Sequence, residues 1–193
     1  MGILILGLII FFGVHAISII NEPWRNRMVA TLGAGPWKGL YALAALGGFV
    51  LLIWGYGLAR QDSPVVYVSP FWMRHLAMLL MLPVFPLLLA TYLPGRIKAW
   101  VRHPMLVAIL CWAFAHLLVN GRLADILLFG AFLLWAVFDL LSLRRREGRP
   151  VPAAPVSRFN DLIALVAGLA LYGLFLVWLH GLLIGVPLIS PSA

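Results

Sequence analysis

Long apolar runs dominate this sequence, and they leave a chain of this length few ways to fold. Runs without Lys or Arg at their centres lie at about residues 2–21, 38–58, 72–93, 104–120, 122–143 and 160–182. A helix of about 20 apolar residues crosses a bilayer, and lipid offers exposed backbone groups no hydrogen-bond partners. The runs therefore predict an all-α, polytopic integral membrane protein, a bundle of about six transmembrane helices.

The composition supports a single transmembrane domain over residues 1–193. Of the 193 residues, 64% are hydrophobic and 10% are charged, and the mean hydropathy is +1.04. Six spans of about 20 residues leave only short connections, so a large extramembrane catalytic module is excluded. Cys111 is the only cysteine. A disulfide framework, a thiolate zinc site and a two-cysteine attachment of haem are therefore excluded as well.

The basic residues predict membrane lipid as a partner and no nucleic acid. The net charge of +8 comes from Lys and Arg in connections beside apolar runs, where headgroups and topology explain it. Three alternate connections carry eleven of them: Arg25, Arg27, Lys38, Arg96, Lys98, Arg102, Arg144, Arg145, Arg146, Arg149 and Arg158. The opposite side carries Arg60, Arg74 and Arg122. The positive-inside rule then predicts a bacterial inner (cytoplasmic) membrane protein with both termini in the periplasm.

Several residues predict how the spans begin, turn and end. Gly121, after Asn120, is expected to take the left-handed conformation that closes a hairpin between the fourth and fifth spans. Pro83 and Pro86 are expected to kink the third span without ending it. Asn160 is expected to cap the last span, with Asp161 in its first turn.

Six polar residues inside the apolar runs need an explanation: His15, His75, His116, His180, Asp125 and Asp139. The two aspartates have structural explanations. Asp125 lies in a first helical turn, where the helix dipole favours a carboxylate, and Asp139 lies within reach of the Arg144–Arg146 cluster. An imidazole in hydrocarbon either hydrogen-bonds to a neighbouring helix or binds a metal. No acidic pair or cysteine cluster accompanies these histidines. Haem b, which needs one or two neutral imidazoles and an apolar slot, is therefore the expected cofactor.

His116 and His15 have the most suggestive neighbours. Trp112 and Asn120 lie four residues either side of His116 and would share its helix face. His15 shares its face with Phe11, Phe12 and Ser18. Simple packing explains both faces as well as a cofactor does. His103, in Arg102-His103-Pro104, lies at the start of the fourth span and points about 140° away from His116.

Two segments carry a resemblance to a known family. FFGVHAI, which contains His15, and VRHPMLVAILCWAFAHLLVNG, from Val101 to Gly121, resemble the NnrU family of denitrification-associated bacterial membrane proteins. That family is similar to the 15-cis-zeta-carotene isomerases. The resemblance implies haem b held by His15 and His116 as metal ligands, in a site with Trp112, Asn120, Arg102 and His103. It also implies that the iron acts on a conjugated polyene without net oxidation. Ala113 stands where the isomerases can bring a cysteine near the iron.

Depth in the membrane leaves other ligand pairs open. With both termini outside, His15 lies roughly 20 Å from the outer end of its span, and His116 lies about 6 Å from its own. His75 and His180 fall near the outer face with His116, so they are the alternative metal ligands.

Three functions remain open, and so does the question of whether the chain is an enzyme. The first is a haem b protein linked to denitrification, with nitric oxide as ligand, or to isomerisation of an apolar polyene that enters from the bilayer. The second is a sensor or assembly factor without catalysis, with or without haem. The third is a membrane methyltransferase of the isoprenylcysteine type, which Arg102-His103-Pro104 also resembles. Such enzymes usually carry polar and acidic C-terminal residues, which are missing from Leu162 to Ala193.

Overall fold

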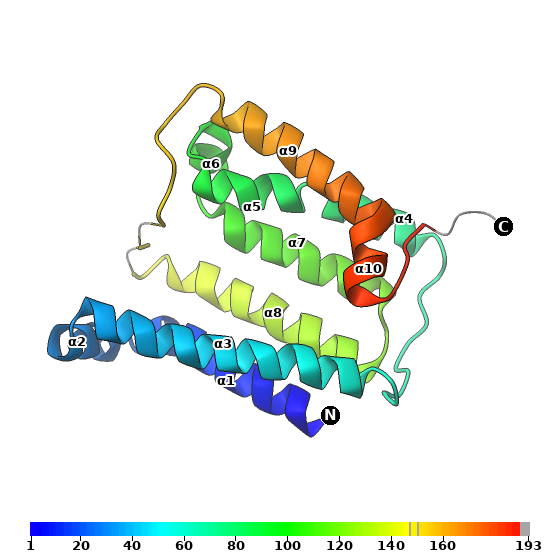
Figure 1. Ribbon diagram of the computed structural model, residues 1–193, viewed down its shortest axis with the longest axis horizontal. Helices are drawn as coiled ribbons and strands as arrows, with labels where there is room; N and C mark the ends of the chain where they lie inside the picture. The colour runs from blue at the N-terminus through cyan, green and yellow to red at the C-terminus, as the bar shows by residue number, and fades with distance from the viewer. Residues whose placement is uncertain (147, 150, 190–193) are drawn as a thin grey trace. The chain divides into compact units, whose positions relative to one another are not determined.

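The computed structural model describes residues 1–146, 148–149 and 151–189, and all of its regular elements there are helices. Its elements (Figure 1) are α1 (Gly2–Ile20), α2 (Glu22–Leu32), α3 (Ala34–Ala59), α4 (Met73–Met81), α5 (Val84–Tyr92), α6 (Arg96–Val101), α7 (Pro104–Val119), α8 (Leu123–Ser142), α9 (Asn160–Leu174), the π-helix η1 (Phe175–Leu179) and α10 (His180–Ile184). Among these residues five helical segments are long and apolar enough to cross a membrane, and Pro104–Val119 is a shorter apolar helix. The predicted all-α membrane fold is confirmed.

Two compact units make up the described chain. Unit 1 comprises Met1–Met73 and His116–Gly148, and unit 2 comprises Arg74–Ala115 and Arg149–Ala193. The expectation that 1–193 forms one transmembrane domain stays a prediction.

Glycines bring α1 and α3 of unit 1 into backbone contact. The two helices run side by side in opposite directions (Figure 1). A Cβ at Gly48 would lie 2.6 Å from the backbone nitrogen of Phe11. One at Gly55 would meet the backbone of Leu4, and one at Gly7 that of Leu52. Small residues allow this close approach, which is how helices gain packing energy in lipid.

Helix α8 packs on the same pair through aromatic rings and one buried carboxylate. It runs parallel to α1, because Phe11 contacts Phe132 at 5.7 Å and His15, one turn later, contacts Trp135 at 5.8 Å between ring centroids. Toward α3, Asp125 accepts a 2.7 Å hydrogen bond from the Tyr56 hydroxyl. Asp125 also accepts one from the backbone N–H of Arg122. This carboxylate therefore caps α8 and ties it to α3.

Residues 61–72 close the end of unit 1 at which α7 turns into α8. Val66 and Tyr67 donate backbone hydrogen bonds to the Gly121 carbonyl at 2.7 and 3.2 Å. The Tyr67 hydroxyl donates to the carbonyls of Leu117 and Asn120, which the end of α7 leaves unpaired. Burial raises the pKa of Tyr67, and the nearby Asp125 carboxylate raises it further, so the hydroxyl keeps its proton as a donor.

The predicted reason for Gly121 is wrong. Positive φ angles among the described glycines occur at Gly33 and Gly185, and Gly121 does not adopt one. It is needed because a Cβ there would collide with the Tyr67 carbonyl oxygen.

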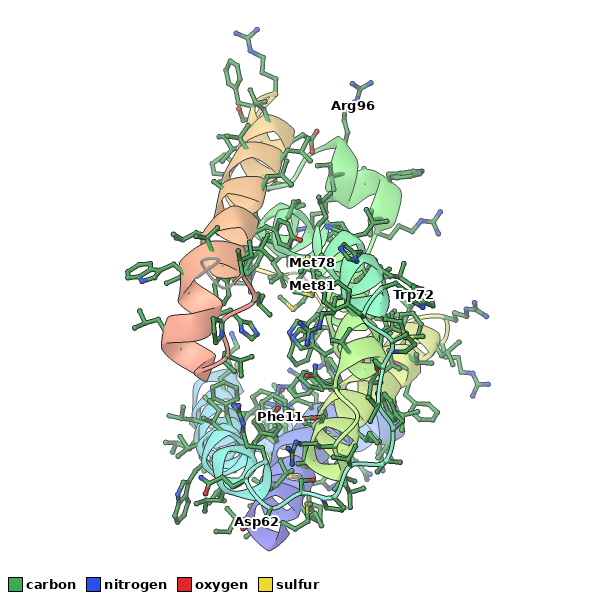
Figure 2. The ribbon with its side chains drawn as sticks, turned by 90° about the vertical axis from the view of Figure 1, so that its right-hand side faces the viewer. Phe11, Asp62, Trp72, Met78, Met81 and Arg96 are labelled. Carbon is green, nitrogen blue, oxygen red and sulfur yellow. The ribbon has the colours of Figure 1, made fainter. Side chains whose placement is uncertain are left out.

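Unit 2 is built on α5, α7 and α9. Its core cluster is Val84, Leu87 and Ala108, with neighbours that include Cys111 and Trp112. Helix α9 lies along α5 (Figure 1) because Gly168 lets it approach the backbone of Pro86. The Tyr172 hydroxyl donates to the carbonyl of Met78, which Figure 2 labels on α4.

The third span, Met73–Tyr92, continues past Pro83, as predicted. A two-residue break separates α4, which ends at Met81, from α5, which begins at Val84, because Pro83 supplies no N–H. Sequence and structure differ at the start of α9. Asn160 does not cap α9. Its side chain donates to the carbonyls of Pro94 and Pro155 at 2.8 and 3.0 Å. Asp161 lies in the first turn of α9, as predicted. Its carboxylate also accepts hydrogen bonds from the backbone N–H groups of Arg96 and Ile97 at 2.8 and 3.0 Å, so it caps α6 as well.

Candidate functional site

His15 is held in one orientation by its own helix. The Nδ1 atom lies 2.6 Å from the backbone carbonyl oxygen of Phe11, one turn earlier. Because a carbonyl can only accept, Nδ1 carries the proton, and Nε2 of the neutral ring is the nitrogen with a lone pair. Metal-binding histidines usually have this arrangement, in which one ring N–H is bonded to the protein and the other nitrogen binds the metal.

Aromatic rings from three helices surround the His15 imidazole. Phe11 of α1 lies 4.2 Å away between ring centroids and tilted by 31°. Tyr41 of α3 and Trp135 of α8 meet it edge-on at 5.4 and 5.8 Å. Figure 2 labels Phe11 among the helices of unit 1, where it also contacts Phe49 and Phe132. The ring is half-buried in an apolar aromatic environment that excludes most water.

Trp135 has an unsatisfied polar atom beside this ring. Its indole nitrogen Nε1 is buried and has no hydrogen-bond partner among the residues that the structure describes. A buried donor without an acceptor costs about 1–3 kcal/mol. Such a group calls for an explanation, and an acceptor atom on a bound molecule supplies one.

His116 lies in the same unit near the end of α7. Its ring stacks on Phe129 of α8, with centroids 4.5 Å apart and planes at 27°. The side-chain amide and the backbone N–H of Asn120 both donate to the His116 carbonyl, at 3.0 and 2.9 Å. Asn120 therefore ends α7 by capping it.

The remaining predicted site residues lie in unit 2. Trp112 packs against the core of Val84, Leu87 and Ala108. His75 belongs to α4. His180 belongs to α10, where its Nδ1 lies 2.7 Å from the Val186 carbonyl oxygen. Within unit 1, the described residues bring His15 and His116 into the same group of helices as Trp135.

Arg102 and His103 form a strained corner before α7. Arg102 has φ 64° and ψ −50°, the one positive φ among the described non-glycine residues. His103 N donates to the Val101 carbonyl at 2.7 Å, which closes a γ-turn around Arg102. Pro104 then begins α7, as predicted. Strained backbone conformations of this kind persist only where the surrounding structure imposes them, and they are common at functional sites.

Asp139 has a structural partner, as predicted. It pairs with the Arg146 guanidinium and lies within hydrogen-bond distance of the Ser142 hydroxyl. No group of three or more His, Cys, Asp or Glu side chains gathers as a metal site in the described ranges.

Sequence reasoning missed Trp135 and Tyr41 as neighbours of His15. The sequence around a tryptophan in an apolar run is the same whether or not its indole N–H has a hydrogen-bond acceptor. The sequence therefore gives no signal for Trp135. Phe11, four residues before His15, was expected on the face of that histidine, and its contact with the imidazole confirms the expectation.

The residues around His15 are chemically compatible with a haem. They supply a neutral imidazole with an anchored Nδ1, flat aromatic neighbours and the buried N–H of Trp135, which has no acceptor among the described residues. His116 supplies a second imidazole in the same unit.

Comparison with known proteins gives one family match. The family model described as NnrU protein matches residues 3–188, nearly the whole chain. No curated protein and no solved structure matches.

Proposed function

Because the chain belongs to the NnrU family, we propose that it is a haem b-binding membrane protein with a role in denitrification, in nitrite or nitric oxide metabolism. The observation that carries the proposal is His15, whose Nδ1 is anchored on the Phe11 carbonyl beside the unsatisfied N–H of Trp135. The denitrification role rests on the family resemblance. We further propose a bacterial inner-membrane location with both termini in the periplasm, supported by the eleven basic residues on one side.

Bound haem would supply an iron that binds diatomic ligands and exchanges single electrons. The Phe11 carbonyl accepts from Nδ1 of His15, which leaves Nε2 as the atom that would bind the iron. Tyr41, Phe11 and Trp135 exclude water around it. The sequence resemblance adds His116 as a second donor.

Polyene isomerisation is the less favoured activity. The isomerases that the family resembles can place a cysteine three residues before the second ligand, and this chain has the fully buried Ala113 there. Cys111, two positions away, packs against the core of unit 2. A thiolate exchange at the iron therefore has no donor at the expected position.

Haem content tests the binding proposal. The full chain is produced in haem-replete cells, purified in detergent, and assayed for haem per protein by its pyridine adduct. We expect near-stoichiometric haem b in the wild type, and loss of most of it in His15→Ala. His180→Ala tests the alternative ligand of unit 2, and it should keep its haem if His15 is the ligand. Equal haem in wild type and His15→Ala would contradict the proposal.

Nitric oxide and a polyene separate the functional classes. If the protein acts in denitrification or as a sensor, the reduced protein should bind nitric oxide with a shift in its absorption spectrum. It should leave a cis-polyene in the same micelles unchanged. Isomerisation of the polyene by wild type but not by His15→Ala would overturn this choice. Turnover of nitric oxide with an added electron donor would distinguish an enzyme from a sensor or assembly factor.

A further inference from the structure

We propose that the indole N–H of Trp135 donates a hydrogen bond to a carboxylate of the haem, a proposal that rests on the haem binding proposed above. Trp135 then holds the periphery of the porphyrin, whereas histidine holds its metal. Among the buried side-chain nitrogen and oxygen atoms in the described part of the chain, Trp135 Nε1 is the one without a hydrogen-bond partner.

The Trp135 ring is fixed by its neighbours on α1. It contacts the Phe12 ring at 5.9 Å and the His15 imidazole at 5.8 Å between centroids. Turning the indole toward a different acceptor would break these contacts. A buried tryptophan N–H usually has a partner, and leaving it without one is costly. The indole nitrogen therefore indicates an acceptor that belongs to a bound molecule.

The missing acceptor lies close to the proposed metal ligand. Trp135 meets the His15 imidazole edge-on, and Tyr41 of α3 meets the same ring at 5.4 Å. The donor therefore belongs to the group of side chains that surrounds His15. A molecule bound through Nε2 of His15 is the nearest source of an acceptor.

Haem b has one kind of peripheral group that suits this donor. Its pyrrole nitrogens bind the iron, and its methyl and vinyl groups are apolar. The carboxylates of its propionate side chains remain as acceptors. A hydrogen bond from an N–H to a carboxylate is roughly twice as strong as one between neutral groups. The orphaned donor and the porphyrin periphery are therefore complementary.

Trp135, His15 and Tyr41 lie toward the same end of unit 1. His15 is five residues before the end of α1, Tyr41 is seven after the start of α3, and Trp135 is seven before the end of α8. Helix α3 runs opposite to α1, and α8 runs parallel to it (Figure 1). All three side chains are therefore within about two helical turns of that end.

This end of unit 1 carries a net positive charge. Asp139, one turn after Trp135, is already paired with the Arg146 guanidinium. Positive charge stabilises a carboxylate that is brought into an apolar site. The basic residues at this end are Arg25, Arg27, Lys38, Arg144, Arg145 and Arg146, and the acidic ones are Glu22 and Asp139. The charge therefore favours an anionic group on the bound molecule.

Release of porphyrins with and without carboxylates tests the hydrogen bond. The purified full chain, as wild type and as Trp135→Phe, is loaded with haem b or with iron etioporphyrin, which has only alkyl groups at its periphery. Transfer of each porphyrin to excess apomyoglobin is then timed. We expect haem b to leave Trp135→Phe about five- to tenfold faster than wild type, because one hydrogen bond is lost. Iron etioporphyrin should leave both proteins at the same rate.

The wild type alone gives a second readout. Infrared difference spectra compare the loaded with the unloaded protein. An indole N–H stretching band should move to lower frequency with haem b and stay in place with iron etioporphyrin. A band that does not respond to haem b would contradict the hydrogen bond.

The control and the outcomes separate the donor from the ring, and this hydrogen bond from haem binding itself. Trp54→Phe makes the same substitution at a residue that is 57% exposed, and it should release haem b at the wild-type rate. Equal release of haem b from wild type and Trp135→Phe would overturn the hydrogen bond and leave haem binding intact. Faster release of both porphyrins from Trp135→Phe would also overturn it, because ring packing would then be responsible. A wild type that binds neither porphyrin would overturn the proposed function as well.

Discussion

Arg102 holds a backbone conformation that L-residues rarely adopt. Its φ of 64° brings Cβ close to the following backbone, and this costs about 1–2 kcal/mol. Glycine has no Cβ and removes the cost. We expect Arg102→Gly to raise the free energy of unfolding by about 1 kcal/mol, measured by thermal unfolding in detergent. Arg102→Ala keeps Cβ and should give no gain. A gain in the alanine variant equal to that in the glycine variant would show that the side chain, and not the backbone, is responsible.

Gly121 is needed for space and not for its φ angle. An alanine there would push its Cβ into the Tyr67 carbonyl and separate residues 61–72 from the turn between α7 and α8. We expect Gly121→Ala to lower the free energy of unfolding by roughly 2 kcal/mol, within the range for overpacking. Gly130→Ala, in open space on α8, should be neutral or slightly stabilising because alanine favours helix. If both variants unfold alike, the close approach to Tyr67 does not exist.

For His15, the sequence predicted the neighbour on its own helix but not the neighbours on other helices. A lone imidazole in an apolar run could be recognised as anomalous from the sequence alone, because the cost of burying it is independent of the fold. Its Phe11 neighbour followed from the helical repeat. Tyr41 and Trp135 come from other helices, and only the packing of α3 and α8 against α1 brings them together.

At the scale of elements, hydropathy predicted the spans because each must satisfy its backbone internally. The predicted run 122–143 and the observed α8, Leu123–Ser142, differ by one residue at each end. Helices α2 and α6 were not predicted, since short polar connecting segments have no apolar run to mark them. The π-helix Phe175–Leu179 lies within a continuous apolar run, where the same residues are compatible with either helical form.

The close contact between α1 and α3 predicts that alanine has opposite effects on the free energy of unfolding at the neighbouring glycines Gly47 and Gly48. Gly48→Ala forces a Cβ against the Phe11 backbone and should lower the free energy of unfolding by about 1–3 kcal/mol. Gly47→Ala meets nothing within 4 Å and should raise it by up to about 1 kcal/mol through helix propensity. Chemical unfolding followed by tryptophan fluorescence measures both. Destabilisation by Gly47→Ala equal to that of Gly48→Ala would contradict the packing.

At the scale of the whole molecule, the charge distribution predicts which ends face the cytoplasm. Cys111 is the only native cysteine, so Cys111→Ser gives a background in which a single introduced cysteine reports its side. We expect Asp62→Cys to react with a membrane-impermeant maleimide in intact spheroplasts. Arg145→Cys should react only after permeabilisation. The reverse pattern would invert the proposed topology without affecting the fold.

We propose that the His15 imidazole, which is anchored on the Phe11 carbonyl among aromatic rings, binds haem iron. The most direct test is the absorption spectrum of the full chain, purified in detergent from haem-replete cells and recorded oxidised and then reduced. We expect a Soret band that shifts on reduction and is absent from His15→Ala. A wild-type preparation that is colourless yet folded, with helical circular dichroism and a monodisperse elution profile, would contradict it.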